Sequence, residues 1–525
     1  MLFITNLYFT ICACITYITL YFVKQQTVAN LVFPTKRSDY DIVNVKKWVL
    51  GNKSNKSLIL HIDKTNDQPA IGYWLFGLMS KIPYFRSDTR WDNYQQAKQF
   101  VDGYSQYLTP FCRYYDYDRF ADDKELLNMV VERGVAANLL TYDSTTNTYF
   151  VDTMFLGSYQ VREPYIKYGA KATFNNKLEI ISITTVHHGK TFYYQQAHNS
   201  EVHRDCRIYD DVNDDINNDI NNDVNDYKKL WAEAVNIFIS SSCVYSYVVI
   251  HTLHCHLSTI GGISGAVNET FNIDHRMYKL LWPILHKMMY ITSGNVISYS
   301  KAGGIINRLF AFTTQGYCDL MDNHVDKFRL LQFDTLVEQQ GMHNEYSRNS
   351  LIYWDTIKEF VTQATSVLAI SDEDQNAFVF NCHKYLYNLE QTLQQYNLNE
   401  KFIRILTSFI FNATVWHKQV EITLDNFIDP RMLKTKINKN HICQLVDDKL
   451  NTEEKMIILL FTNVLMRRLM TLSDDYSSLY RSDNHDNHYT DDDCANLWHT
   501  FTTTLNKRLQ QTQFTCLLPQ NVRIL

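Results

Sequence analysis

The sequence predicts a mainly α-helical protein with minor β elements. Glycine and proline are scarce, with 16 and 8 copies among 525 residues, which disfavours a turn-rich all-β chain. Long segments in the second half of the chain carry apolar residues at helical spacing, whereas strand-like alternation is confined to short stretches. Hydrophobic residues make up 45% of the chain and charged residues 20%, so the protein can bury a large core.

The charge balance argues against nucleic acid as a partner. Lys and Arg number 50 against 56 Asp and Glu, and the formal net charge is −6, so the chain has no basic excess to neutralise phosphates. The eleven cysteines include no CxxC pair, so a thiolate zinc site is not expected. Aromatic residues at 14%, mainly Tyr and Phe, suit apolar packing or a lipid-like ligand.

The N-terminal segment 1–23 is predicted to be a signal peptide or a membrane anchor. Residues 2–23 carry no charged side chain, and about 20 apolar residues can span a bilayer. Either interpretation places the protein at a membrane or in the secretory pathway. Basic residues downstream of the segment would keep an anchored body cytoplasmic, whereas sequons at Asn52, Asn55 and Asn268 fit a lumenal body. The orientation stays open.

The first half of the body has mixed character. Residues 24–100 remain unassigned. Within 119–190, an apolar run at 126–140 is followed by alternating stretches at 149–155 and 178–185, which predicts minor β elements there. The Asn/Asp-rich quasi-repeat at 210–226 has almost no core-forming power and is predicted to be a solvated low-complexity insertion. It lacks the glycine that an EF-hand calcium loop requires at its sharp turn.

The chain from residue 228 onward is predicted to be largely helical. Segments 227–257, 277–289 and 401–424 are apolar-rich or carry apolar residues at helical spacing. Asp429-Pro430 is expected to end the third of these helices. Phe501, Leu505 and Leu509 predict a last helix near the C-terminus.

Three histidines stand together in the apolar segment VVIHTLHCHLSTI: His251, His254 and His256. They are either core side chains with satisfied nitrogens or ligands. Each helical residue turns ~100°, so His251 and His256 diverge by about 140° in a regular α-helix. A π-type turn would bring these two onto one face, and such turns concentrate at functional sites. The pair His251 and His254 needs no such turn, and the spacing alone leaves both pairs open.

A second pair of ligand-type residues lies on the later apolar segment. His417 and Glu421 are four residues apart, hence on one helical face. The alternative is a salt-bridging turn at the surface, which the neighbouring Lys418 would favour. The familiar HExxH, phosphate-loop and GxSxG motifs are missing from the sequence, so hydrolase and nucleotide-enzyme interpretations lack a nucleophile or a phosphate cradle.

Together these segments resemble the lipoxygenase family. Trp231 opens a helix, His251 and His256 supply an H-x4-H pair, and HRMYKLLWP follows at 275–283 like the family's histidine and KLL segment. GGII at 303–306 matches a downstream NGII-like turn. His417 and Glu421 stand where the family has H-x3-N, and the C-terminal PQNVRIL resembles the family's P-N-S-x-x-I tail. The resemblance covers 228–310, 401–431 and the tail.

The resemblance implies that residues 101–525 form a large helical catalytic domain holding one non-haem iron. His251, His256 and His417 would be the imidazole ligands, Glu421 would stand at the variable fourth position, and the main-chain carboxylate of Leu525 would close the site. Imidazole and carboxylate ligands suit iron or manganese, and the family favours iron. The family chemistry removes a bis-allylic hydrogen from a polyunsaturated fatty acid by ferric hydroxide and adds O2, which yields a hydroperoxide.

Four features depart from the family pattern. Glu421 replaces the usual neutral Asn, and Tyr247 and Leu424 stand where the family has glutamines near the ligands. The Gly-rich GGISGAVNETF replaces an expected arginine, and the chain ends in Leu525 rather than Ile. The family's N-terminal β-sandwich domain is also not evident. A catalytically silent member with a structural or lipid-binding role is therefore the alternative to an active dioxygenase.

Overall fold

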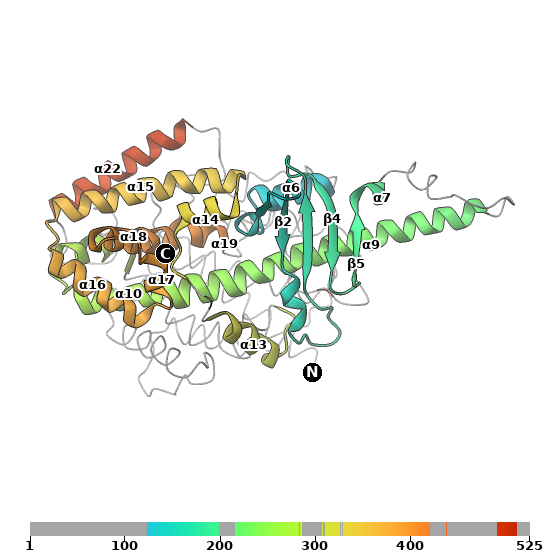
Figure 1. Cartoon of the computed structure of the whole chain (residues 1–525), viewed down its shortest axis with the longest axis horizontal. Coiled ribbons are helices and arrows are strands. Elements are labelled where there is room, and N and C mark those ends of the chain that lie inside the picture. The colour runs from blue at the N-terminus through green and yellow to red at the C-terminus, as the bar shows by residue number, and fades with distance from the viewer. Residues whose placement is uncertain are drawn as a thin grey trace, which may run out of the picture.

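The structure is a computed structural model of the whole chain. It describes residues 123–198, 216–420, 437 and 491–511, apart from 283, 286–306, 308–309, 326 and 328. The predicted leader 1–23, the region 24–100, Glu421 and Leu525 lie outside these residues. The described part is mostly helical with one small sheet (Figure 1), which confirms the predicted mainly α class.

The sheet is an antiparallel meander of five strands in chain order. Its strands are β1 (Thr141–Asp143), β2 (Thr148–Asp152), β3 (Ala170–Phe174), β4 (Ile180–Thr185) and β5 (Lys190–Tyr193). Burial alternates along β3, where Ala170, Ala172 and Phe174 face inward, so one face of the sheet packs on a helix. The two alternating stretches of the sequence contain β2 and β4, which confirms the predicted β elements.

Four short elements precede, separate or follow the strands along the chain. They are α6 (Asp123–Glu132), the 3-10 turns η2 (Ala137–Leu139) and η3 (Met154–Ser158), and α7 (Tyr194–His198). The apolar run at 126–140 forms α6 and η2, and α6 contacts β4. A side chain at Gly134 would lie 2.8 Å from the Val130 Cα, so only glycine lets the chain turn so tightly after α6.

One continuous helical rod joins the sheet to the rest of the molecule. It consists of α9 (Ile216–Val244), the π-helical segment η4 (Tyr245–Ile260) and α10 (Gly261–Thr270). Figure 1 shows the rod running the length of the molecule, with α9 passing the sheet. It contacts β3, β4 and β5. Among the described residues, Asp226–Thr270 is the one helix long and apolar enough to cross a membrane, but its most apolar window is 83% buried, as in a core helix.

The predicted low-complexity loop at 210–226 is wrong from Ile216 onward. Residues 216–226 form the first turns of α9, while 210–215 lie outside the described residues. Ile216, Ile220 and Val224 recur every four residues, a period that continues a helix. The polar composition of the repeat conceals this period in the sequence. The helix accordingly begins at Ile216, 15 residues before Trp231, where the sequence predicted its start.

The second half of the molecule is a helical layer packed around the end of this rod. Its elements are α13 (Thr314–Val325), α14 (Phe333–Gln340), α15 (Glu345–Val367), α16 (Asp372–Tyr385), α17 (Leu389–Leu393), α18 (Leu398–Phe411), η6 (Asn412–Trp416), α19 (His417–Val420) and α22 (Asp492–Gln510). Residues 276–282 and 284–285 are helical as well. Side chains cap several N-termini, and Ser371 forms a full capping box with Asp374. The helices predicted within 277–289, 401–424 and at 501–509 are present where the structure describes them.

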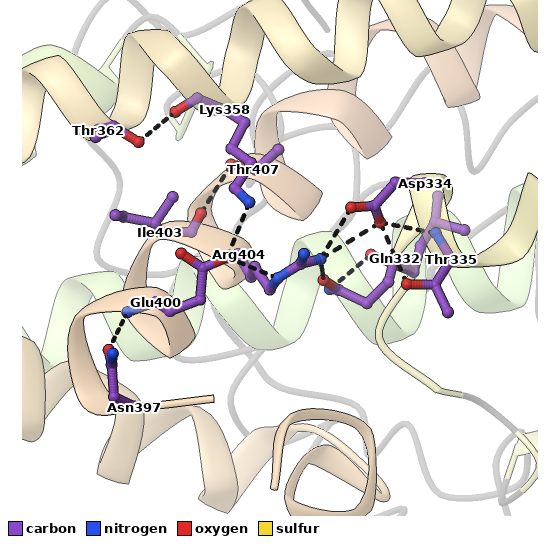
Figure 2. Close-up of polar contacts among 11 residues, drawn as sticks. Gln332, Asp334, Thr335, Lys358, Thr362, Asn397, Glu400, Ile403, Arg404 and Thr407 are labelled. Atoms are coloured by element: carbon purple, nitrogen blue, oxygen red, sulfur yellow. Dashed lines mark hydrogen bonds and ion pairs between the residues drawn. The ribbon is translucent and has the colours of Figure 1, made fainter. Parts of the chain in front are cut away.

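Arg404 connects α18 to two neighbouring helices (Figure 2). Its guanidinium donates to Glu400 at 2.9 Å, to Gln332 at 2.9 Å and to Asp334 at 3.2 Å. Lys358 of α15 pairs with the same Glu400 at 2.9 Å. Because Arg404 is only 8% exposed, these charge-assisted bonds fix α18 against α14 and α15. The chain continues from α18 directly into η6 and α19.

The segment η4 lies where two hydrophobic cores meet. Val248, Leu253 and Leu257 belong to the core that contains the sheet. Ile250 and Ile260 belong to the core of the helical layer. The middle of the rod therefore has protein on every side, which makes η4 a rigid place to hold polar side chains.

Candidate metal centre

The π-helical geometry of η4 decides which histidines act together. Its hydrogen bonds reach five residues back, as in the bond from the Gly261 N–H to the His256 carbonyl. Residues five apart therefore share a face, and the Nε2 atoms of His251 and His256 lie 3.2 Å apart. Of the two pairings that the sequence left open, the structure has the pair His251 and His256.

A second π-helical segment presents His417 to this pair. Residues 412–416 form η6, and the His417 Nε2 lies 2.8 Å from the Nε2 of His251 and 2.9 Å from that of His256. We call these three side chains the histidine triangle. It joins residues 161 and 166 positions apart in the chain.

The triangle is fully enclosed. The exposed fractions are 5% for His251, 1% for His256 and 2% for His417. Burial lowers the pKa of His256 to about 3. Burial, followed by the charge of His256, holds the pKa of His251 well below its ordinary value. Both imidazoles are therefore neutral at pH 7, the protonation state in which a ring nitrogen can bind a metal ion.

The three facing nitrogens fit a bound cation better than a hydrogen-bonded core cluster. Each neutral Nε2 carries either a proton or a lone pair, so among three mutually facing atoms at least two must be alike and repel. A cation accepts a lone pair from all three. Metal–imidazole bonds of about 2.1 Å at right angles place ligand nitrogens about 3.0 Å apart, which agrees with the observed 2.8–3.2 Å. These donor atoms form a group that could hold a metal ion.

His254 does not join the triangle. It is half-buried on another face of η4, where burial, followed by the charge of His324, lowers its pKa to about 4. His324 lies on α13, which packs on η4. His254 therefore lies apart from the three histidines whose ring nitrogens face one another.

The segment after His417 is buried. Lys418 is 8% exposed and Gln419 is 7% exposed, so the alternative of a surface salt-bridging turn at His417 is wrong. The Gln419 amide donates to the Gly134 carbonyl at 2.6 Å and thereby anchors α19 to the turn after α6. Glu421 and Leu525, predicted to complete the ligand set, lie outside the described residues.

Two neighbours of the triangle carried little or no functional signal in the sequence. The Tyr247 ring stacks on the His251 ring, with centroids 4.7 Å apart and planes at 28°, at the position where the family resemblance expected glutamine. The Cys255 thiol donates to the Asn412 carbonyl at 3.2 Å. Both contacts depend on how η4 is wound, which spacing alone does not give.

Comparison with known proteins places this geometry in a known architecture. The sequence matches no protein-family model and no curated protein. A LOX deletion variant in complex with arachidonate has a TM-score of 0.62 at 14% identity, over 92% of this chain and 76% of that chain. Manganese lipoxygenase of Gaeumannomyces graminis has a TM-score of 0.58 at 9% identity, over 95% and 89%. The chain has the lipoxygenase fold.

A calcium-dependent 11R-lipoxygenase adds a further match, with a TM-score of 0.59 at 14% identity over 81% of this chain and 68% of that chain. The fold predicted from the order of the histidine, KLL and tail motifs is thus confirmed. In this lipoxygenase fold the long rod supplies His251 and His256, and the first residue of α19, directly after the π segment η6, supplies His417.

Proposed function

We propose that the chain is a lipoxygenase-type dioxygenase, which inserts O2 into a polyunsaturated fatty acid and releases a hydroperoxide. The observation that carries the proposal is the buried histidine triangle within a lipoxygenase fold. A metal dioxygenase needs such a set of imidazoles on rigid elements. The arachidonate held by one structural neighbour supports a fatty acid as the substrate.

His251, His256 and His417 would hold the metal ion through Nε2, with Glu421 and the carboxylate of Leu525 completing the set. We propose non-haem iron first and manganese second, since a structural neighbour is a manganese lipoxygenase and this nitrogen and oxygen donor set suits both. The bound ion would supply the one-electron chemistry that removes a bis-allylic hydrogen. Burial keeps the imidazoles of His251 and His256 neutral and excludes water from all three histidines.

A catalytically silent, lipid-binding lipoxygenase-fold protein is the second candidate. Tyr247 stacks on His251 at the place where the family resemblance expects glutamine, and Glu421 replaces a neutral Asn. An additional anionic ligand favours the ferric state and would slow redox cycling. If Glu421 is what silences the protein, Glu421→Asn raises turnover, whereas a fall in turnover identifies Glu421 as an adapted ligand of an active enzyme.

We also propose that the apolar segment 1–23 brings the protein to a membrane or into the secretory pathway, close to its substrate. Fractionation of cells that express the full chain tests this proposal. Recovery with membranes or in the secreted fraction is expected, and recovery of the full chain in the soluble cytosol alone contradicts it.

The experiment that tests the main proposal is oxygen uptake by the full chain supplied with iron, with linoleate and arachidonate as substrates. Uptake with conjugated-diene product is expected for the wild-type protein and is lost in His417→Ala together with bound iron. His254→Ala is the matched control, since this neighbouring histidine lies outside the triangle, and it should keep both iron and uptake. Folded, iron-loaded wild-type protein that shows no uptake would favour the silent relative.

A further inference from the structure

Two hydrogen bonds to one carbonyl connect the two metal-ligand helices. The Asn412 carbonyl accepts the backbone N–H of His417, a π-type bond across five residues. The same oxygen accepts the thiol of Cys255 at 3.2 Å, and Cys255 directly precedes His256. The Asn412 oxygen therefore connects Cys255, the neighbour of His256, to the backbone of His417.

The surroundings of this path make its geometry specific. Cys255 is 0% exposed and Asn412 is 2% exposed, so water does not compete for the carbonyl. The Asn412 side chain is engaged elsewhere, because its amide donates to the Ser408 carbonyl at 2.7 Å. The segments η4 and η6 are in direct contact, and the Cys255 thiol is a side-chain donor that crosses from η4 to η6.

We propose that Cys255 is a positioning residue for the metal centre, which sets the register of η4 against η6 so that His417 meets His251 and His256. A π segment is an irregular winding that a regular α-helix can replace. A donor fixed to the carbonyl at the start of η6 favours the winding in which the His417 N–H reaches the same oxygen. This inference rests on the proposed metal site and adds a residue that does not itself bind the ion.

The alternative is that Cys255 only fills space between the two helices, as a small buried apolar residue does. The two roles make opposite demands on a substitution. Cys255→Ser keeps a hydrogen-bond donor and gives up apolar volume. Cys255→Val keeps apolar volume and gives up the donor.

The test is the affinity of the full chain for Mn²⁺, measured by electron paramagnetic resonance of the unbound ion, with Fe²⁺ titrated anaerobically in parallel. If Cys255 acts as a positioning residue, Cys255→Val weakens Mn²⁺ binding about 10-fold to 100-fold, the range found when groups supporting metal ligands are removed. The Mn²⁺ affinity of Cys255→Ser stays close to that of the wild type. Equal affinities, or a loss in Ser but not in Val, overturn the inference. Cys382→Val, at another fully buried thiol, shows the cost of placing Val in this core.

The same titration separates this inference from the proposed function. If the wild-type protein binds Mn²⁺ and Fe²⁺ and His417→Ala does not, the proposed metal site stands, whether or not the Cys255 variants change the affinity. Wild-type protein that binds neither ion overturns both proposals. Thermal unfolding of each variant without metal identifies misfolding. If Cys255→Val is unfolded at the assay temperature, Cys255→Ala replaces it. Cys255→Ser is then expected to bind Mn²⁺ more tightly than Cys255→Ala.

Discussion

Each side chain of the histidine triangle is as deeply buried as the apolar residues around it. Burying an imidazole nitrogen without a partner is unfavourable, and the Nδ1 atoms of His251 and His256 have no hydrogen-bond partner among the described residues. Three Nε2 atoms that face one another add repulsion between like groups. A cation that takes up the three Nε2 lone pairs removes this repulsion, although it gives the Nδ1 atoms no partner.

Gln419 gives a prediction at the scale of one residue. Its amide donates to the buried Gly134 carbonyl, which also accepts the backbone N–H of Ala137 at 3.0 Å. Gln419→Ala therefore removes one of two hydrogen bonds to this oxygen and should lower the free energy of unfolding by about 0.5–1.5 kcal/mol. Urea denaturation measures this change. Gln363→Ala, at an exposed position of α15, is the control and should stay within about 0.5 kcal/mol of wild type. Equal effects of the two substitutions would show that the Gln419 anchor contributes nothing.

At the scale of elements, Arg404 is expected to be the most sensitive charged position of α18. Replacing it by Met keeps much of the aliphatic stem but leaves Glu400, Asp334 and Gln332 without their shared donor. Glu400 keeps its pair with Lys358, and both carboxylates are partly exposed, so the expected cost is about 1.5–3 kcal/mol, that of losing a hydrogen bond to a charged group. Lys401→Met on the same helix removes a longer, more exposed pair with Glu390 and should cost at most about 1 kcal/mol. Chemical denaturation of both variants tests the contrast.

The N-terminus of α22 gives a prediction about pH. Asp491 caps this helix and accepts from Arg276 at 2.9 Å, a hydrogen bond that holds the pKa of the Asp491 carboxyl below its ordinary value. Since the unfolded carboxyl titrates near pH 3.9, the stabilisation is fully present above that pH and is lost as the pH falls through the lower, folded pKa.

Asp491→Asn keeps a capping oxygen but cannot ionise. Wild type should therefore be more stable than this variant at pH 7, and the difference in unfolding free energy should shrink as the pH falls below about 4. Urea denaturation at pH 7, 5 and 3 measures it. A difference that stays constant or grows toward pH 3 would rule out the ionised Asp491 as its source.

The elements also show what spacing can and cannot predict. The helices around His251 and His417 follow from their apolar stripes, and the fold follows from the order of the histidine and KLL motifs. The Asn/Asp repeat was assigned to a loop because composition outweighed the four-residue period of Ile216, Ile220 and Val224. The choice between His254 and His256 needed the π winding of η4, which the spacing of the three histidines does not determine. Contacts such as Gln419 with Gly134 join residues 285 positions apart and are set by tertiary structure alone.

At the scale of the whole molecule, the candidate metal centre brings together parts of the chain that lie far apart in the sequence. His251 and His256 come from the rod, and His417 comes from the helical layer 166 and 161 positions later. An ion bound by all three adds a crosslink that the unfolded chain lacks. Binding to the folded state alone stabilises it by RT ln(1 + [L]/Kd), or about 2.7 kcal/mol when the free ion is at 100 times its Kd.

Adding Fe²⁺ or Mn²⁺ should therefore raise the unfolding temperature of the wild-type protein in proportion to the logarithm of the free ion concentration. His417→Ala breaks the connection between the rod and the helical layer, so its unfolding temperature should not respond to metal, whereas His254→Ala should respond like wild type. Differential scanning calorimetry over a metal series measures all three proteins. An equal rise in His417→Ala would show that His417 does not hold the stabilising ion, because removing a ligand of that ion must weaken the response of the unfolding temperature to metal.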